Sequence, residues 1–226
     1  MKKKLIRAAV VIAAVALVYA AAVFIGRAAL AGSQPISDGD LTARMRELIP
    51  AAEEINEIVW GAGLPVDPDA APLLDSVTGA QYRFVSPEAK YQSLDELRAA
   101  AAAVYSDAFI RDHIAYVAFD GYEPQNGESD LFALSPRYTV RKELSESGVA
   151  RDRLCIDITK TAFELSARLD PASARFVSRV VEWNGLWWDS DRIVVELDES
   201  FRGQTAPRRL TLRLENGVWL LDEPSY

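Results

Sequence analysis

Four titratable side chains that could transfer protons lie close together near the middle of the chain, at Asp107, Asp112, His113 and Asp120. A histidine beside a carboxylate is a common pair for general acid–base chemistry. If this segment is helical, His113 and Asp120 are seven residues apart and share roughly one face, whereas Asp107 and Asp112 do not. The alternative is a solvated helix face with a surface histidine. The spacing leaves both interpretations open, a pocket at His113 and Asp120 or an exposed face.

Residues 183–191 read WNGLWWDSD and hold three tryptophans, Trp183, Trp187 and Trp188. Tryptophan is enriched at binding hot spots, so an exposed cluster of this kind would anchor a protein partner or a glycan. The alternative is a hairpin connection in which the rings cover the open end of a sheet. The run is therefore a candidate partner-binding surface or part of the core.

The segment GYEPQNGESD, residues 121–130, is rich in turn residues and predicts a loop. Loops on a rigid scaffold often carry binding residues, so Tyr122 is a further candidate contact for a partner. The segment lacks the regularly alternating oxygen ligands of an EF-hand, and we expect no calcium site there.

Cys155 is the only cysteine and His113 the only histidine. These counts exclude a disulfide within the chain and any metal site that needs several thiolates or two imidazoles. Cys155 lies in the alternating stretch RLCIDIT, which predicts a small buried side chain in a strand. The chain has no Gly-rich phosphate loop and no GxSxG, HExxH or CxxC motif. We therefore expect no metal, no cofactor and no catalytic residue, and predict that the protein is not an enzyme.

The charge is strongly asymmetric along the 226 residues. All 33 acidic side chains and 20 of the 25 basic ones follow residue 32, which gives residues 33–226 a net charge of -13. So acidic a domain repels nucleic acid, and we exclude nucleic acid as a partner.

The N-terminal segment, residues 1–32, places KKKLIR before an uncharged run from Ala8 to Ile25. Such a run as a helix approaches the hydrocarbon thickness of a bilayer. It predicts a single-pass anchor in a bacterial cell membrane, with the basic N-terminus in the cytoplasm and the rest extracytoplasmic. The alternative is a signal peptide cleaved after Ala31, which would make the protein secreted.

The remainder is expected to hold a polar linker over residues 33–39 and one α+β domain over residues 40–226. Apolar residues at three- and four-residue steps predict a helix from Asp40 that Pro50 kinks or splits and that Gly61 and Gly63 end. Serines at positions 93 and 106 read as helix caps. Further alternating stretches predict strands, with 141–152 and 166–174 as connections between them.

The C-terminal stretch LTLRLENGVWLLDEPSY reads as a β-hairpin turning at Asn216-Gly217. Both faces of its last strand are apolar, so we expect that strand to be central in the sheet or covered on both sides. The pattern as a whole predicts helices packed on one face of a curved antiparallel sheet.

Several stretches resemble the cystatin/NTF2-like domains of exported bacterial proteins, and more narrowly the IseA-type DL-endopeptidase inhibitor group. The resemblance is carried by INEIVWGAGLP (55–65), YQSLDELRAAAAAVYSDAF (91–109), SPRYTV (135–140) and GVWLLDEPSY (217–226). It implies a non-enzymatic protein that blocks cell-wall peptidases of the NlpC/P60 class. The chain departs from the pattern in its N-terminal segment, its acidity and an insert at 141–152.

Three functions follow as hypotheses. The first is a membrane-anchored extracytoplasmic binding protein that regulates a cell-wall hydrolase, or another envelope protein, by contact. The second is a small-ligand or enzymatic domain with a pocket in the concave face of the sheet. The third is a structural component of an envelope complex.

Overall fold

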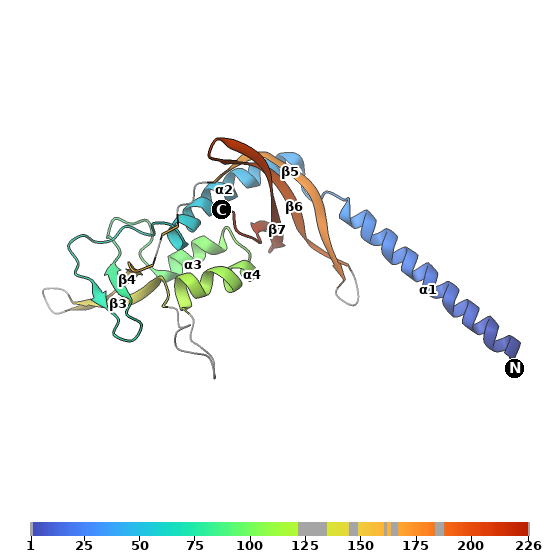
Figure 1. The fold of residues 1–226 in the computed structure, drawn as a ribbon, viewed down its shortest axis with the longest axis horizontal. Helices are drawn as coiled ribbons and strands as arrows, with labels where there is room; N and C mark the ends of the chain where they lie inside the picture. The colour runs from blue at the N-terminus through green and yellow to red at the C-terminus, as the bar shows by residue number, and fades with distance from the viewer. Residues whose placement is uncertain are drawn as a thin grey trace.

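The computed structural model describes residues 2–121, 135–144, 149–160, 162–163, 167–183 and 188–225. The fold is α+β, with helices and antiparallel sheets, as the sequence predicted (Figure 1). The elements in chain order are α1 (Lys2–Ala31), α2 (Asp38–Val59), β1 (Leu73–Leu74), β2 (Gln81–Phe84), α3 (Leu94–Ala102), α4 (Asp107–Phe109), the π-helical segments η1 (Ile110–Ile114) and η2 (Tyr116–Asp120), β3 (Tyr138–Leu144), β4 (Ala150–Asp157), β5 (Arg168–Trp183), β6 (Trp188–Phe201), β7 (Gln204–Glu215) and β8 (Val218–Leu221).

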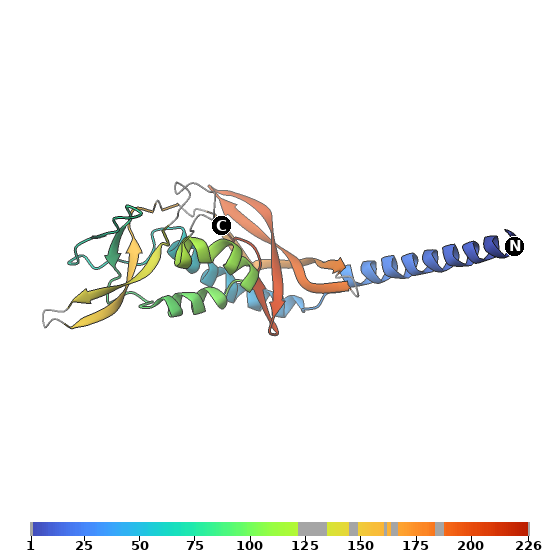
Figure 2. The ribbon, with the colours of Figure 1, turned by 90° about the horizontal axis from the view of Figure 1, so that it is seen from below.

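The strands form two antiparallel sheets, where one was predicted. The first has the order β1-β2-β4-β3 and the second β5-β6-β7-β8. They are separate because β2, which precedes α3 and α4, pairs with β4, with Tyr82 opposite Asp157. In Figures 1 and 2 the β3–β4 hairpin lies at one end of α2, α3 and α4, while the second sheet curls over α2.

Two segments predicted as connections belong to strands. Residues 141–144 continue β3, and residues 150–152 begin β4. Most of 166–174 lies in β5, although Pro171 and Ala172 read as turn residues. The register of β5 against β6 shifts between Asp170 and Arg175, and a bulge of this kind accommodates a proline that cannot donate to the ladder.

Helix α2 supplies much of the core. Ser37 caps it, because its hydroxyl accepts a hydrogen bond from the Asp40 amide. The helix runs unbroken through Pro50, so of the two predicted effects, a kink or a split, the split is wrong. A proline inside a helix costs about 3 kcal/mol, and buried neighbours such as Ile49 and Ala52 hold the helix in place on both sides.

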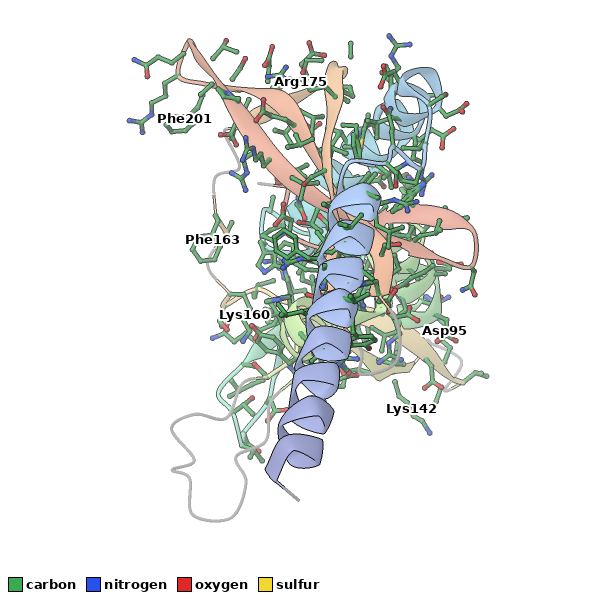
Figure 3. All side chains as sticks on the ribbon, turned by 90° about the vertical axis from the view of Figure 1, so that its right-hand side faces the viewer. Asp95, Lys142, Lys160, Phe163, Arg175 and Phe201 are labelled. Atoms are coloured by element: carbon green, nitrogen blue, oxygen red, sulfur yellow. The ribbon has the colours of Figure 1, made fainter. Side chains whose placement is uncertain are left out.

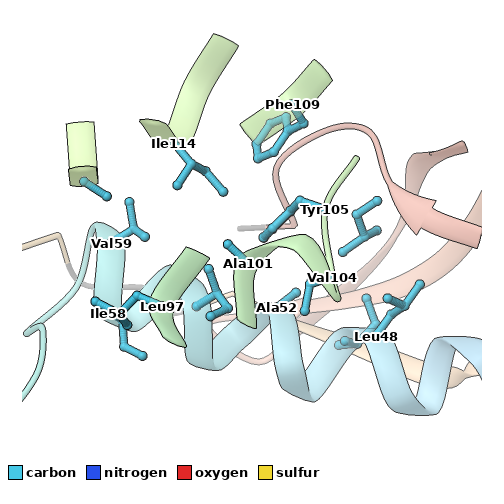
Figure 4. Close-up of a cluster of buried hydrophobic side chains, with 14 of the residues drawn as sticks. Leu48, Ala52, Ile58, Val59, Leu97, Ala101, Val104, Tyr105, Phe109 and Ile114 are labelled. Atoms are coloured by element: carbon cyan, nitrogen blue, oxygen red, sulfur yellow. The ribbon is translucent and has the colours of Figure 1, made fainter. Parts of the chain in front are cut away.

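The helices that follow begin where the serines predicted. The Ser93 hydroxyl accepts from the Glu96 amide at 3.2 Å, and the Ser106 hydroxyl accepts from the Phe109 amide at 3.1 Å. Side chains of α3 and of the segments after it pack on α2, as Figure 4 shows. The labelled members of this cluster are Leu48, Ala52, Ile58, Val59, Leu97, Ala101, Val104, Tyr105, Phe109 and Ile114.

The C-terminal strand β8 is buried but stands at the edge of its sheet, so it is covered and not central. It follows a turn in which Asn216 and Gly217 both have positive φ, at 51° and 80°. Its outer edge is closed by main-chain hydrogen bonds between Leu221 and the segment 104–106. Beyond β8, Ser225 is buried and accepts a hydrogen bond from the Asn56 side-chain amide at 3.0 Å.

No helix among the described residues is long and apolar enough to cross a membrane. The prediction of a single-pass anchor, and with it the localisation in a bacterial cell membrane, is therefore wrong. The side chains of α1 are described only over residues 16–31.

Candidate functional site

The predicted partner-binding tryptophans lie at the hairpin between β5 and β6, where Trp183 pairs with Trp188. Trp188 is half-buried, and the Arg27 guanidinium of α1 lies 5.8 Å from the centroid of its ring. Trp187, Tyr122 and the side chain of Trp183 lie outside the described residues. The structure thus places only Trp188, in contact with α1.

The predicted acid–base residues lie on the π-helical segments and are both exposed. The His113 ring stacks at a tilt on Phe109, with 4.8 Å between the centroids. The Asp120 carboxylate accepts a hydrogen bond from the Arg98 guanidinium at 2.7 Å. Neither side chain lines the cavities described next.

Two cavities share a wall at the C-terminal end of α2, where the turn after the helix meets the end of β4. The larger has a volume of about 520 Å³ and the smaller about 180 Å³. Arg137 and Lys160 line both. The larger is bounded mainly by residues 62–66 and 156–158, whereas the wall of the smaller is mostly apolar and includes Val59, Trp60, Val117 and Phe163.

Arg137, just before β3, is 4% exposed and is held by main-chain carbonyls. Its Nη1 donates to the Val59 carbonyl at 3.1 Å and its Nη2 to the Gly61 carbonyl at 2.6 Å. Its Nε is buried without a hydrogen-bond partner in the described structure. No carboxylate of the described residues forms an ion pair with Arg137. A buried permanent cation therefore lines the cavities with no ion-pair partner among the described residues, and the Asp157 carboxylate, which also lines the larger cavity, is hydrogen-bonded elsewhere.

Lys160 follows β4 on a turn that Asp157 fixes. The buried Asp157 carboxylate accepts from the Thr159 amide at 2.9 Å and from the Thr159 hydroxyl at 2.6 Å. It also accepts from the Ser135 hydroxyl at 3.1 Å. Lys160 is half-buried, and within the described ranges its ammonium has no hydrogen bond or ion pair. Asp157 is thus a positioning residue for a second cation at the cavity wall.

Tyr138 fixes the turn that forms the floor of the larger cavity. Its hydroxyl donates to the Ile58 carbonyl and accepts from the Leu64 amide, both at 3.0 Å. Burial raises the pKa of Tyr138 to about 12, because the phenolate would lose its hydration. Gly63 lies in the same turn with φ +82°, and a Cβ there would stand 2.4 Å from Ile156 Cδ1.

The rim of the cavities is apolar and open to solvent. Phe163 is 63% exposed and Ile158 is 42% exposed. The Phe163 amide donates to the Trp60 carbonyl at 2.9 Å, so Phe163 is attached to the end of α2. Figure 3 shows Lys160 and Phe163 on one side of the molecule, with Lys142 on the other. An exposed aromatic ring thus stands beside two cations that form no ion pair with any described residue.

This arrangement is suited to binding an anionic group next to an apolar one. The cations supply charge-assisted hydrogen bonds, and the smaller cavity supplies apolar surface. Cys155 is not at the wall, and burial raises the pKa of its thiol to about 11, which makes it unreactive. No cluster of three or more metal-ligating side chains is present among the residues that the structure describes.

No protein-family model matches the chain, and no curated protein matches it significantly. The likeness to cystatin/NTF2-like domains and to the IseA-type group stays a hypothesis.

The sequence patterns did not point to the residues of this site. Arg137 lies in SPRYTV, which was interpreted as part of a strand and as one stretch that carries the resemblance, and Lys160 and Phe163 lie in another segment interpreted as a strand. The available local signal was the turn WGAGLP after a long amphipathic helix, with Trp60 at the helix end. Nothing in the spacing connects that turn to residues 137 and 160.

Proposed function

We propose that the protein is a non-catalytic binding protein that regulates a cell-wall hydrolase by direct contact. The observation that supports binding is the open site at the end of α2. There, exposed Phe163 and Ile158 lie beside cavities lined by two cations that have no ion-pair partner in the described ranges. Exposed apolar groups beside a concave polar site are typical of protein contacts. The hydrolase as partner rests on the resemblance to the IseA-type inhibitors.

The concave face of the second sheet supports a ligand pocket less well. Its inward side chains are buried in the core together with those of α2, among them Ile193, Val195, Leu197, Leu210 and Leu212. A ligand there would have to displace packed apolar side chains, which costs several kcal/mol. The cavities at the end of α2 are formed already, so a ligand site is better placed there.

The test is digestion of peptidoglycan by purified NlpC/P60 peptidases with and without the full chain. We expect dose-dependent inhibition and a weaker effect for Phe163→Ala. Phe201→Ala is the matched control, because Phe201 is also exposed but stands on β6, away from the cavities. If the wild-type chain inhibits none of the peptidases, the proposal of a hydrolase regulator fails. If Phe163→Ala and Phe201→Ala inhibit equally, the assignment of the contact surface fails.

A further inference from the structure

We infer that the cavities at the end of α2 bind the carboxylate of a ligand that carries an apolar group beside it, as the C-terminal residue of a peptide does. The inference rests on the proposed binding function and names the chemistry that its site recognises. It concerns the two cations, Arg137 and Lys160, which line both cavities.

The first argument is the uncompensated charge. Arg137 is buried, and within the part of the chain that the structure describes its guanidinium donates to two neutral main-chain carbonyls. Several other arginines form ion pairs: Arg153, for example, pairs with Glu143 and with Asp67. Taking a cation out of water is costly unless an anion or several hydrogen bonds replace the water. A carboxylate in the larger cavity would supply the missing negative charge.

The second argument is that a buried side chain, Asp157, holds the turn that carries Lys160. Asp157 is 1% exposed and uses three hydrogen bonds to hold the turn that carries Lys160. The main chains of Asp157 and Arg137 are also joined, because the Asp157 amide donates to the Arg137 carbonyl at 2.8 Å. Hydrogen bonds therefore connect the segments that carry the two cations, as a preorganised anion site requires.

The third argument is the apolar surface beside the charge. Val59, Val117 and Phe163 line the smaller cavity, which shares Arg137 and Lys160 with the larger one. A phosphate or sulfate would use the cations and leave this surface unused. A carboxylate attached to an apolar side chain would use both, and the larger cavity, about 520 Å³, lies within the usual range of small-ligand sites.

The test measures binding of acetyl-Ala-Phe with a free carboxylate, and of the same dipeptide as its C-terminal amide, to the full chain by titration calorimetry. We expect saturable binding of the free acid and at least tenfold weaker binding of the amide. Lys160→Gln should weaken binding of the free acid at least tenfold. Lys142→Gln, a change at an exposed lysine on β3, should leave the affinity unchanged. Phenylacetate distinguishes the sources of the carboxylate: binding as tight as that of the dipeptide would assign the site to a small acid instead of a chain end.

Equal binding of acid and amide would overturn the inference, and so would absence of binding by either. Equal affinities of the Lys160→Gln and Lys142→Gln variants would also overturn it. Arg137 is not used as the test position, because its replacement would remove the hydrogen bonds to the Val59 and Gly61 carbonyls and so disturb the turn itself. If the free acid does not bind, the peptidoglycan assay still tests hydrolase inhibition separately. If the chain inhibits no hydrolase, the free acid can still bind, so the two failures are distinguishable.

Discussion

Tyr138 is the residue whose replacement tests the construction of the site most sharply. Its hydroxyl joins the Ile58 carbonyl and the Leu64 amide across the turn that ends α2. In Tyr138→Phe both groups stay buried without that partner, and each unsatisfied group costs about 1–3 kcal/mol. Because the turn relaxes in part, we expect the free energy of unfolding at pH 7 to fall by about 2 kcal/mol.

The pH dependence adds a second signature. The folded pKa of Tyr138 is raised from 10.0 to about 12, so folding favours the neutral phenol. Its contribution is complete below pH 10 and is lost as the pH rises towards 12. The difference corresponds to about 3 kcal/mol at its limit. Since phenylalanine does not titrate, the stability gap between the wild type and Tyr138→Phe should narrow between pH 10 and pH 12.

Urea unfolding followed by tryptophan fluorescence at pH 7 and at pH 10 to 11 measures both effects. Tyr116→Phe is the control, because Tyr116 is exposed and its loss should change stability by less than about 0.5 kcal/mol at either pH. A gap of similar small size for Tyr138→Phe at pH 7, or a gap that does not change above pH 10, would refute the role given to this hydroxyl.

Three further predictions test the surroundings. Gly63→Ala should lower the free energy of unfolding by more than about 2 kcal/mol, because of its positive φ and the clash with Ile156. Gly79 also has a positive φ but open space around it, so Gly79→Ala should cost about 1 kcal/mol in urea unfolding. Equal losses would contradict the close packing of the turn at Gly63. Deletion of residues 218–226 should abolish the cooperative thermal transition, because β8 is buried, and a retained transition would refute this. Native Cys155 should react with iodoacetamide at pH 8 far more slowly than in urea, since its thiol is buried and its pKa is about 11; equal rates would show that it is accessible.

Local chemistry predicted the helices well. The caps at Ser93 and Ser106 depend on contacts within three residues, so their sequence signals translate directly into structure. The turn at Asn216-Gly217 is equally local, because its backbone conformation favours those two residue types. Residues close in sequence decide these features, and neighbours in space change them little.

The division of the strands into two sheets depends on distant pairing. Tyr82 pairs with Asp157, on the far side of α3 and α4 in the chain, and no local pattern fixes that choice. Pro171 shows the opposite error: a local breaker signal was overruled, because a bulge in β5 removes the need for the missing amide donor. Side-chain patterns located the strands approximately, but only the folded structure shows which strands pair and how they are connected.

The site was missed for a related reason. Trp60, Arg137 and Lys160 come from three segments that meet only in the folded chain. The charges alone gave no signal, because the chain holds 25 basic and 33 acidic side chains and most of these are solvated. What distinguishes Arg137 is burial without a carboxylate partner, in a chain where acids are in excess. An acidic protein can neutralise a buried arginine with one of its own side chains, so an arginine left to main-chain carbonyls at a cavity wall points to an anion from outside.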